Sequence, residues 1–254
     1  MPDVISLLNF KGGTGKSSAT QNLADILARR GMKILVIDGD RQSNTTATFL
    51  GQRVKPSLTD VICEKATFAE AIHQARENIS IIGSDTDLDH AIIHLKEYHR
   101  AWSIIPNGIK KLQGIDLVLI DQAGAYTSVM EALLRSSNKV LIPCELEPYS
   151  VQGIFDMFTK LQTELPDHEL DNGGIIPYAV DMRPKMTRIY LDQLKEAFGL
   201  LVLPSIRTDQ TVPNAQSVQK TVMEYDPRCP AAQDFATLAT HLFAPASVSL
   251  EVQS

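Results

Sequence analysis

Short, almost continuously apolar runs alternate along the chain with longer amphipathic segments. Such runs are typical of strands that are buried on both faces of a parallel sheet. We predict seven strands, at residues 4–10, 33–38, 79–82, 116–121, 139–144, 174–180 and 200–206. The intervening segments predict helices at about residues 16–30, 67–77, 86–100, 128–136, 150–164, 185–197 and 231–243.

This alternation predicts an α/β fold, in which helices cover both faces of a doubly wound, mostly parallel β-sheet. No repeat, low-complexity stretch or long linker divides the chain. We therefore expect one domain over residues 1–244, followed by a frayed tail at residues 245–254. Residues 167–174 are expected to form a polar turn.

The composition of the 254 residues is that of an ordinary globular protein, with 44% hydrophobic and 21% charged residues. We find no apolar run of membrane-spanning length and no secretory signal, so we expect a cytoplasmic protein. Cys63, Cys144 and Cys229 lie far apart, which predicts isolated reduced thiols. The net charge of -6 argues against a generally basic nucleic-acid coat protein but leaves room for a local basic face.

The segment NFKGGTGKSS, at residues 9–18, follows the first predicted strand and opens the first predicted helix, which is where a phosphate-binding loop lies. Its glycines let backbone N–H groups converge on phosphate oxygens, and the helix N-terminus adds its positive dipole end. Lys16 is placed to reach the β- and γ-phosphates, and the Ser17 hydroxyl to bind Mg²⁺. The predicted nucleotide contacts in this loop are Lys11, Gly12, Gly13, Thr14, Gly15, Lys16, Ser17 and Ser18.

The loop departs from the usual G-x-x-x-x-G-K-[ST] pattern, because Phe10 stands where the first glycine is expected. Lys11 instead directly precedes two glycines, and this arrangement resembles the deviant Walker A motif of the ParA/MinD/Soj family of P-loop ATPases. The resemblance extends over roughly residues 3–243 and is most specific in the first forty. It implies a P-loop NTPase architecture, ATP and Mg²⁺ as cofactors, and slow ATP hydrolysis that a partner stimulates.

The resemblance also implies that Lys11 reaches across an ATP-sandwiched homodimer to the nucleotide of the partner. A lysine at the outer edge of the loop points away from its own phosphates. We therefore expect its charge to be compensated only when a second anionic site faces it, and a solvated surface lysine is the alternative. By the same resemblance, Glu147 and Ser150 would lie near the dimer interface.

Acidic residues end two of the predicted strands, where the ligands of open α/β sheets bind. Asp38 and Asp40 lie in the segment VIDGDRQSN, and Asp121 ends the run DLVLID as a Walker B carboxylate does. The resemblance implies that Asp40 orients the attacking water and that Asp38 supports the Mg²⁺ shell. The predicted catalytic residues are thus Lys11, Lys16 and Asp40, and the predicted metal residues are Ser17, Asp38 and Asp121. A turn that only caps a helix is the alternative for Asp38 and Asp40.

Other positions are less specific. Arg41 stands where the family often has a proline, and Gln122 begins the segment that replaces a proline pair. No role follows for Gln122. Asp181 and Arg183 come directly after the strand predicted at residues 174–180, and this segment borders the base in the family. They are therefore predicted nucleotide contacts.

The resemblance is nearest to small ParA/Soj proteins, which bind DNA non-specifically as ATP-state dimers. It implies partition or positioning of a cargo (a plasmid, a chromosome origin or a protein assembly), a ParB-like adaptor as partner, and association with the nucleoid. Candidate DNA contacts are Arg183, Lys185, Arg188, Arg207 and Lys220. Solvated helix faces are the alternative, because Asp192, Glu196 and Asp209 lie among them and Thr211 replaces an arginine that the family uses for DNA.

Two other functions stay open: a metabolic P-loop ligase or kinase resembling dethiobiotin synthetase, and a MinD-like positioning ATPase. The tail APASVSLEVQS has no Lys or Arg, which disfavours a basic membrane-binding helix. His90, His94 and His99 recur at helical spacing, which favours a solvated helix flank over a metal site. The single Trp102 is predicted to pack rather than to stack on a nucleobase.

Overall fold

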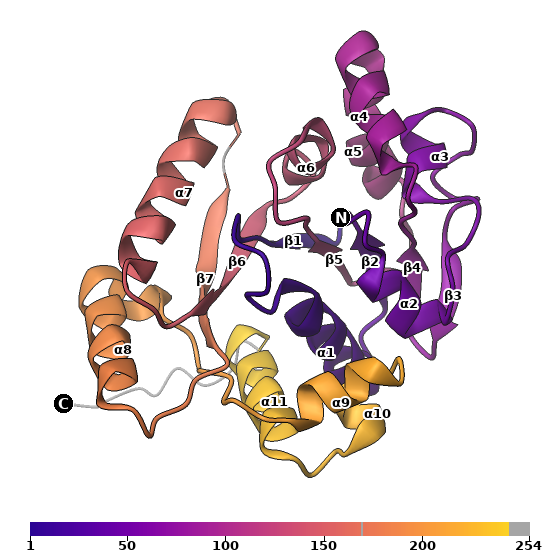
Figure 1. Cartoon of the computed structure of the whole chain (residues 1–254). Coiled ribbons are helices and arrows are strands. Elements are labelled where there is room, and N and C mark those ends of the chain that lie inside the picture. The colour runs from indigo at the N-terminus through magenta and orange to yellow at the C-terminus, as the bar shows by residue number, and fades with distance from the viewer. Residues whose placement is uncertain (169, 244–254) are drawn as a thin grey trace, which may run out of the picture.

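The computed structural model describes residues 1–168 and 170–243, and the predicted tail at residues 245–254 lies outside them. Seven strands form one sheet in the order β3-β4-β2-β5-β1-β6-β7 (Figure 1). They are β1 (Asp3–Leu7), β2 (Ile34–Asp38), β3 (His73–Arg76), β4 (Ile79–Ile82), β5 (Leu117–Asp121), β6 (Lys139–Glu145) and β7 (Asp171–Tyr178). Every neighbouring pair is parallel except β3 and β4, so the predicted α/β class and mostly parallel sheet are confirmed.

Helices cover both faces of this sheet (Figure 1). The helices are α1 (Lys16–Arg29), α2 (Asn44–Leu50), α3 (Leu58–Ile62), α4 (Leu88–Glu97), α5 (Ile104–Lys110), α6 (Ser128–Leu134), α7 (Ser150–Glu164), α8 (Lys185–Phe198), α9 (Thr211–Ser217), α10 (Val222–Tyr225) and α11 (Pro230–Leu242), with 3-10 turns η1 (His99–Ser103) and η2 (Gly199–Leu201). Helices α1, α9, α10 and α11 pack on one face, and α3–α8 pack on the other. No helix in the described part of the chain is long and apolar enough to cross a membrane.

The central strands read as continuous apolar runs because both of their faces are covered. All five residues of β5 are buried. Leu117 and Leu119 contribute to the core beneath α1, while Val118 and Ile120 point to the opposite core beneath α4 and α6. A strand that supplies two cores has no polar face, since successive side chains point to opposite sides of the sheet.

Two predicted elements are wrong, and the polar turn predicted at residues 167–174 is too long, because β7 begins at Asp171. Residues 67–77 do not form a helix; they contain β3, which pairs antiparallel with β4 across the two-residue connection Glu77-Asn78. Asn78 has a φ of 59°, a left-handed conformation that asparagine tolerates in tight hairpins. Residues 200–206 do not form a strand either, because Pro204 has no N–H to donate to a ladder. This segment keeps only an isolated bridge between Ile175 and Val202.

The parallel register brings the polar ends of three strands to one edge of the sheet. Asp38, the last residue of β2, lies opposite Asp121, the last residue of β5. Asp121 in turn lies opposite Leu7, where β1 ends and the glycine-rich loop begins. The loop and both carboxylates are therefore neighbours before any side-chain contact is considered.

Candidate functional site

The glycine-rich loop between β1 and α1 has a backbone that only glycine suits at two positions. Gly13 and Gly15 have φ values of 79° and 89°, in the left-handed region. A Cβ on Gly15 would also lie 2.4 Å from the ring of Tyr178. A Cβ on Gly12 or Gly13 would meet no atom within 4 Å, so these residues face open space. The loop thus leaves its backbone N–H groups accessible at the N-terminus of α1.

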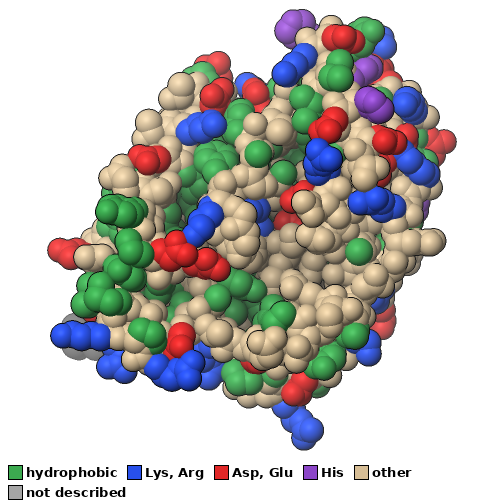
Figure 2. Space-filling model, in the orientation of Figure 1, with side chains coloured by type: hydrophobic (Ala, Val, Ile, Leu, Met, Phe, Trp, Pro, Cys, Tyr) green, Lys and Arg blue, Asp and Glu red, His purple; other side chains and the backbone are tan. Residues whose placement is uncertain are grey.

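A cavity of about 540 Å³ opens over this loop. Its wall combines four segments that are distant in sequence: the loop itself, the residues after β2, Gly124 after β5, and residues from the end of β7 into α9. The lining residues are Gly12–Ser18, Asp40, Gln42, Asn44, Gly124, Tyr178, Ala179, Arg207–Gln210, Val212, Pro213 and Gln216. Figure 2 looks onto this face, where acidic and basic side chains meet near the central hollow.

Lys16 lies inside this site rather than on the surface, with 7% of its area exposed. Its ammonium donates to the backbone carbonyl of Lys11 at 3.1 Å. Burial lowers the pKa of Lys16, and the negative charges of Asp121 and Asp40 oppose this shift. A largely buried cation that is held by a neutral carbonyl is poised to gain an anionic partner such as a phosphate.

The carboxylates of Asp38 and Asp121 are both fully buried, but their oxygens accept different numbers of hydrogen bonds. Asp38 accepts hydrogen bonds from the backbone N–H of Thr46 at 2.8 Å, the Thr46 hydroxyl at 2.7 Å and the backbone N–H of Asp40 at 3.1 Å. Asp121 accepts one at Oδ2, from the Thr45 hydroxyl at 2.6 Å. Its Oδ1 is buried without a hydrogen-bond partner in the described structure.

Burial raises the pKa of both carboxyl groups. The charge of Asp121 raises the pKa of Asp38 further, while the three donors to Asp38 oppose the shift. The hydrogen bond from Thr45, the nearby Ser17 hydroxyl and the charge of Lys16 work against the rise in the pKa of Asp121. Two neighbouring buried carboxylates are costly to ionise, so this edge of the sheet favours a bound cation.

These residues fit a divalent cation such as Mg²⁺. The unpartnered Oδ1 of Asp121 is a buried acceptor, and the Ser17 hydroxyl lies close enough to Asp121 to lower the pKa of that carboxyl. Hydroxyl and carboxylate oxygens, with phosphate and water, are the ligands that Mg²⁺ takes. When bound, the ion would neutralise phosphate charge. Asp40, half-buried in the cavity wall, accepts the backbone N–H of Gln42 at 2.9 Å and lies opposite the loop.

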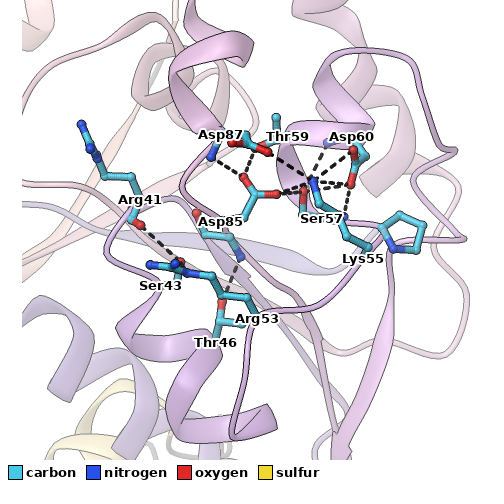
Figure 3. Close-up of polar contacts among 12 residues, drawn as sticks. Arg41, Ser43, Thr46, Arg53, Lys55, Ser57, Thr59, Asp60, Asp85 and Asp87 are labelled. Carbon is cyan, nitrogen blue, oxygen red and sulfur yellow. Dashed lines mark hydrogen bonds and ion pairs between the residues drawn. The ribbon is translucent and has the colours of Figure 1, made fainter.

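The helix that follows Asp40 is held in place by a second polar cluster (Figure 3). The backbone N–H of Ser84 donates to the Thr46 hydroxyl at 2.9 Å. The next residue, Asp85, is buried and accepts the Ser57 hydroxyl at 2.6 Å and the Thr59 hydroxyl at 2.7 Å. Lys55 completes the cluster, with its ammonium 2.7 Å from Asp85. The first turn of α2 is therefore tied both to the carboxylates and to α3.

Lys11 points out of the cavity and is compensated by its own chain. Its ammonium pairs with Glu147 and lies 3.8 Å from Glu145. The hydrogen bond that Lys11 donates to Glu147 raises the pKa of Lys11. The expectation that only a second anionic site would compensate Lys11 is therefore wrong for the single chain. Ser150 shapes the acidic loop, because its hydroxyl accepts the backbone N–H of Glu147 at 2.9 Å.

Comparisons with known proteins agree with this geometry. A family model described as an AAA domain matches residues 2–169. The chain belongs to this family of P-loop ATPases. The chromosome-partitioning ATPase Soj of Thermus thermophilus is 26% identical over 248 residues, covering 94% of this chain and 95% of Soj.

Two solved structures share the fold of this ATPase along nearly its whole length. Apo McdA from Cyanothece superposes with a TM-score of 0.83 at 23% identity and covers 96% of this chain and 100% of the McdA chain. MinD from Pyrococcus horikoshii, solved with Mg-ADP, gives a TM-score of 0.81 at 24% identity and covers 96% and 97%. The ATPase is thus of the ParA, Soj and MinD type.

The structure does not bring Asp181 and Arg183 into the nucleotide cavity of the ATPase. Arg183 is exposed and Asp181 is half-buried, and their side chains pair with each other at 2.7 Å. Residues 207–216 instead form the far wall of the cavity. The bridge between Val180 and Arg207 positions the start of this segment beside the glycine-rich loop. Sequence reasoning missed this segment because it placed a strand at residues 200–206 and looked for the base contacts before that strand. The carboxylate of Asp209 shapes the segment by accepting the backbone N–H groups that open α9 and α11.

The candidate DNA contacts of the ATPase separate into different surfaces. Arg183, Lys185 and Arg188 lie together around the start of α8, where Figure 2 shows blue side chains at the lower left. Arg207 instead pairs with Asp234 at 2.8 Å and lines the nucleotide cavity. Lys220 lines a separate cavity beside α10. The structure therefore groups only three of the five candidates.

The packing of Trp102, outside the site, agrees with the sequence interpretation. The indole N–H of Trp102 donates to the backbone carbonyl of Leu95 at 2.8 Å. Its ring packs against the core beneath α4 and α6, so the packing prediction is confirmed. His94 lies 3.4 Å from Glu64 on the flank of α4. Among the described residues no group of three or more metal-ligating side chains is found.

Proposed function

We propose that this ATPase forms a homodimer around two ATP molecules, binds DNA non-specifically in that state and hydrolyses ATP to position a cargo. The position of Lys11 carries the proposal. Its side chain is 52% exposed, and its ammonium lies at the rim, where a second molecule has access to it. A lysine inside the phosphate-binding motif that leaves its own cavity is suited to the phosphates of a partner.

The residues of one chain supply the rest of the chemistry. Phosphoryl transfer to water requires positioning and charge compensation more than covalent chemistry. Lys16 and Mg²⁺, held by Ser17 and Asp121, would neutralise the β- and γ-phosphates. Asp40 would orient the attacking water. Asp38 would support the metal site indirectly, because its three hydrogen bonds anchor the segment that contains Asp40.

For DNA, we propose Lys185 and Arg188 as the main contacts and Arg183 as a weaker one. Arg183 already pairs with Asp181, so it would have to exchange that carboxylate for a phosphate. Dimerisation doubles the number of phosphate contacts, which makes salt-sensitive binding specific to the ATP state. An adaptor of ParB type would stimulate hydrolysis and link the dimer to its cargo, with the ATPase associated with the nucleoid in the cytoplasm.

Sedimentation with ATP, ADP or no nucleotide tests the dimer, with wild type beside Lys11→Ala. We expect dimers of the wild-type protein with ATP alone, and monomers of Lys11→Ala that still bind ATP. Plasmid DNA is then added at two salt concentrations, with a Lys185→Ala/Arg188→Ala double variant as comparison. Binding that requires ATP, weakens with salt and is lost in the double variant supports the proposal.

Other outcomes favour the alternatives. A monomer that is indifferent to ATP and to DNA would favour a metabolic ligase or kinase of the dethiobiotin synthetase type. An ATP dimer that ignores DNA but binds anionic vesicles would favour a MinD-like positioning ATPase.

A further inference from the structure

Two adjacent threonines in the first turn of α2 each hold a different strand-end carboxylate. The hydroxyl of Thr46 donates to Asp38, and the hydroxyl of Thr45 donates to Asp121 at 2.6 Å. Both threonines are fully buried. One of them, Thr45, therefore touches the carboxylate whose other oxygen has no partner.

The direction of the hydrogen bonds around Thr45 follows from counting protons. Its oxygen lies 3.0 Å from the side-chain nitrogen of Gln21, which is buried in α1. A hydroxyl has one proton to donate, and an ionised carboxylate can only accept. The proton of Thr45 must therefore point to Asp121, and its lone pair must accept the amide proton of Gln21. The order Gln21 to Thr45 to Asp121 leaves no alternative hydrogen-bond direction.

This arrangement sets the orientation of the Asp121 carboxylate. Oδ2 is held by Thr45, which fixes the plane of the group. Oδ1 is the remaining acceptor, buried and without a partner in the described structure. An unfilled buried acceptor is destabilising, so a group that donates to it, such as a metal-bound water, is favoured.

We infer that Thr45 is a positioning residue for the metal site: it holds Asp121 so that Oδ1 is presented to the Mg²⁺ shell, and Gln21 directs its proton. The inference rests on the metal role proposed for Asp121. Partners that orient a metal-binding carboxylate commonly change metal affinity by about 10–100-fold when they are lost.

The test compares Thr45→Val, which keeps the shape and removes the hydroxyl, with Thr45→Ser, which keeps the hydroxyl. Thr48→Val is the matched control, because Thr48 is buried on the same helix and its hydroxyl makes no hydrogen bond to either carboxylate in the described structure. Binding of a fluorescent ATP analogue is measured in a titration with Mg²⁺ and separately in EDTA. Thermal melting establishes that each variant is folded.

We expect Thr45→Val to raise the Mg²⁺ concentration for half-maximal effect about ten-fold or more while leaving ATP affinity in EDTA unchanged. Thr45→Ser and Thr48→Val should remain within about two-fold of wild type. An unchanged Mg²⁺ dependence in Thr45→Val, or an equal loss of affinity with Mg²⁺ and in EDTA, overturns the inference. If Thr45→Val does not fold, Gln21→Leu decides, with a smaller shift in the same direction expected and no shift contradicting the inference.

Asp121→Asn distinguishes a failure of this inference from a failure of the metal role proposed for Asp121. If Asp121→Asn leaves the Mg²⁺ dependence unchanged, the metal role of Asp121 itself is wrong. If Asp121→Asn shifts the dependence and Thr45→Val does not, only the positioning role of Thr45 is wrong.

Discussion

Asp38 and Asp121 are identical side chains in adjacent positions of the sheet, yet their neighbours suit them to different roles. Three donors from the chain occupy Asp38, so its carboxylate organises the loop that carries Asp40. Asp121 keeps one buried oxygen unfilled. The role of each carboxylate thus depends on how many of its oxygen lone pairs already accept hydrogen bonds from the protein. Residue type alone does not reveal that number.

The raised pKa values of these two carboxyls predict how stability depends on pH. Burial raises the pKa of Asp38 to about 7 and that of Asp121 to about 6. The folded protein then binds these protons more tightly than the unfolded chain. Their stabilising contribution is complete below about pH 4 and is lost as the pH rises through 6 to 7.

For the nucleotide-free protein we therefore expect the melting temperature to fall by several degrees between pH 5 and pH 8. Scanning calorimetry over that range measures it. Asp121→Asn removes one of the two titrating groups and should flatten the profile. A melting temperature that rises with pH, or an equal slope in the variant, would contradict this account of the buried pair.

Asp40 differs from both, because it lies in the cavity wall opposite the loop. Asp40→Ala should retain ATP binding and the ATP-dependent dimer while turnover falls roughly 100-fold or more, as expected when a group that positions or deprotonates water is lost. Phosphate release measures turnover, and sedimentation with ATP measures the dimer. Equal loss of binding, dimer and turnover would mean that Asp40 has a structural role.

At the scale of elements, the polar cluster beside α2 carries a stability prediction. Asp85 has four partners, namely Ser57, Thr59, Lys55 and the backbone N–H of Asp87. Asp85→Ala would leave buried hydroxyls without an acceptor, so we expect a loss of about 2–3 kcal/mol in the free energy of unfolding. Urea unfolding monitored by circular dichroism measures it.

Asp87→Ala is the control for the same cluster, because Asp87 is largely exposed and lies 4.0 Å from Lys55. Its effect should stay within about 0.5 kcal/mol. Equal effects of the two substitutions would show that the cluster stabilises α2 and α3 through charge alone rather than through buried hydrogen bonds.

Elements could be predicted from the sequence where burial is symmetric. The strands β2 and β5 are apolar up to their final aspartates because both faces supply a core, and the loop before α1 has a motif of its own. The hairpin strand β3 was not predicted, because its residues are only partly buried and its pairing depends on the turn before β4. The short helices α2, α3, α5, α9 and α10 were not predicted, because segments of at most seven residues show little helical periodicity. The seven residues of α6 were the exception.

The site was predictable where chemistry follows from a motif and not where it follows from tertiary contacts. Lys16, Ser17 and Asp121 could be assigned from spacing. Thr45 acquires its role only when α2 packs against β5, which spacing along the chain does not encode. The cavity wall at residues 207–216 depends likewise on tertiary contacts, among them the bridge between Val180 and Arg207.

At the scale of the whole molecule, the proposed dimer requires Lys11 to leave one anionic environment for another. In the single chain Glu147 and Glu145 hold its ammonium at the rim of the site. Triphosphate carries more negative charge than these carboxylates, so exchange is favourable once a second molecule presents its nucleotide. In the proposed dimer the acidic loop would compete with the partner's triphosphate for Lys11 and so oppose dimerisation.

Glu147→Gln should therefore promote the ATP-dependent dimer. An exposed ion pair is worth about 1 kcal/mol at most, and each dimer exchanges two of them. The expected decrease in the dimer dissociation constant is therefore about 25-fold or less, and it should shrink in high salt. Sedimentation equilibrium with a slowly hydrolysed ATP analogue measures it. Glu131→Gln is the control, because Glu131 pairs with Arg135 on α6, where its charge does not contact Lys11. A weaker dimer in Glu147→Gln would instead mean that Glu147 stabilises the interface, with Lys11 of one molecule keeping a carboxylate partner after assembly.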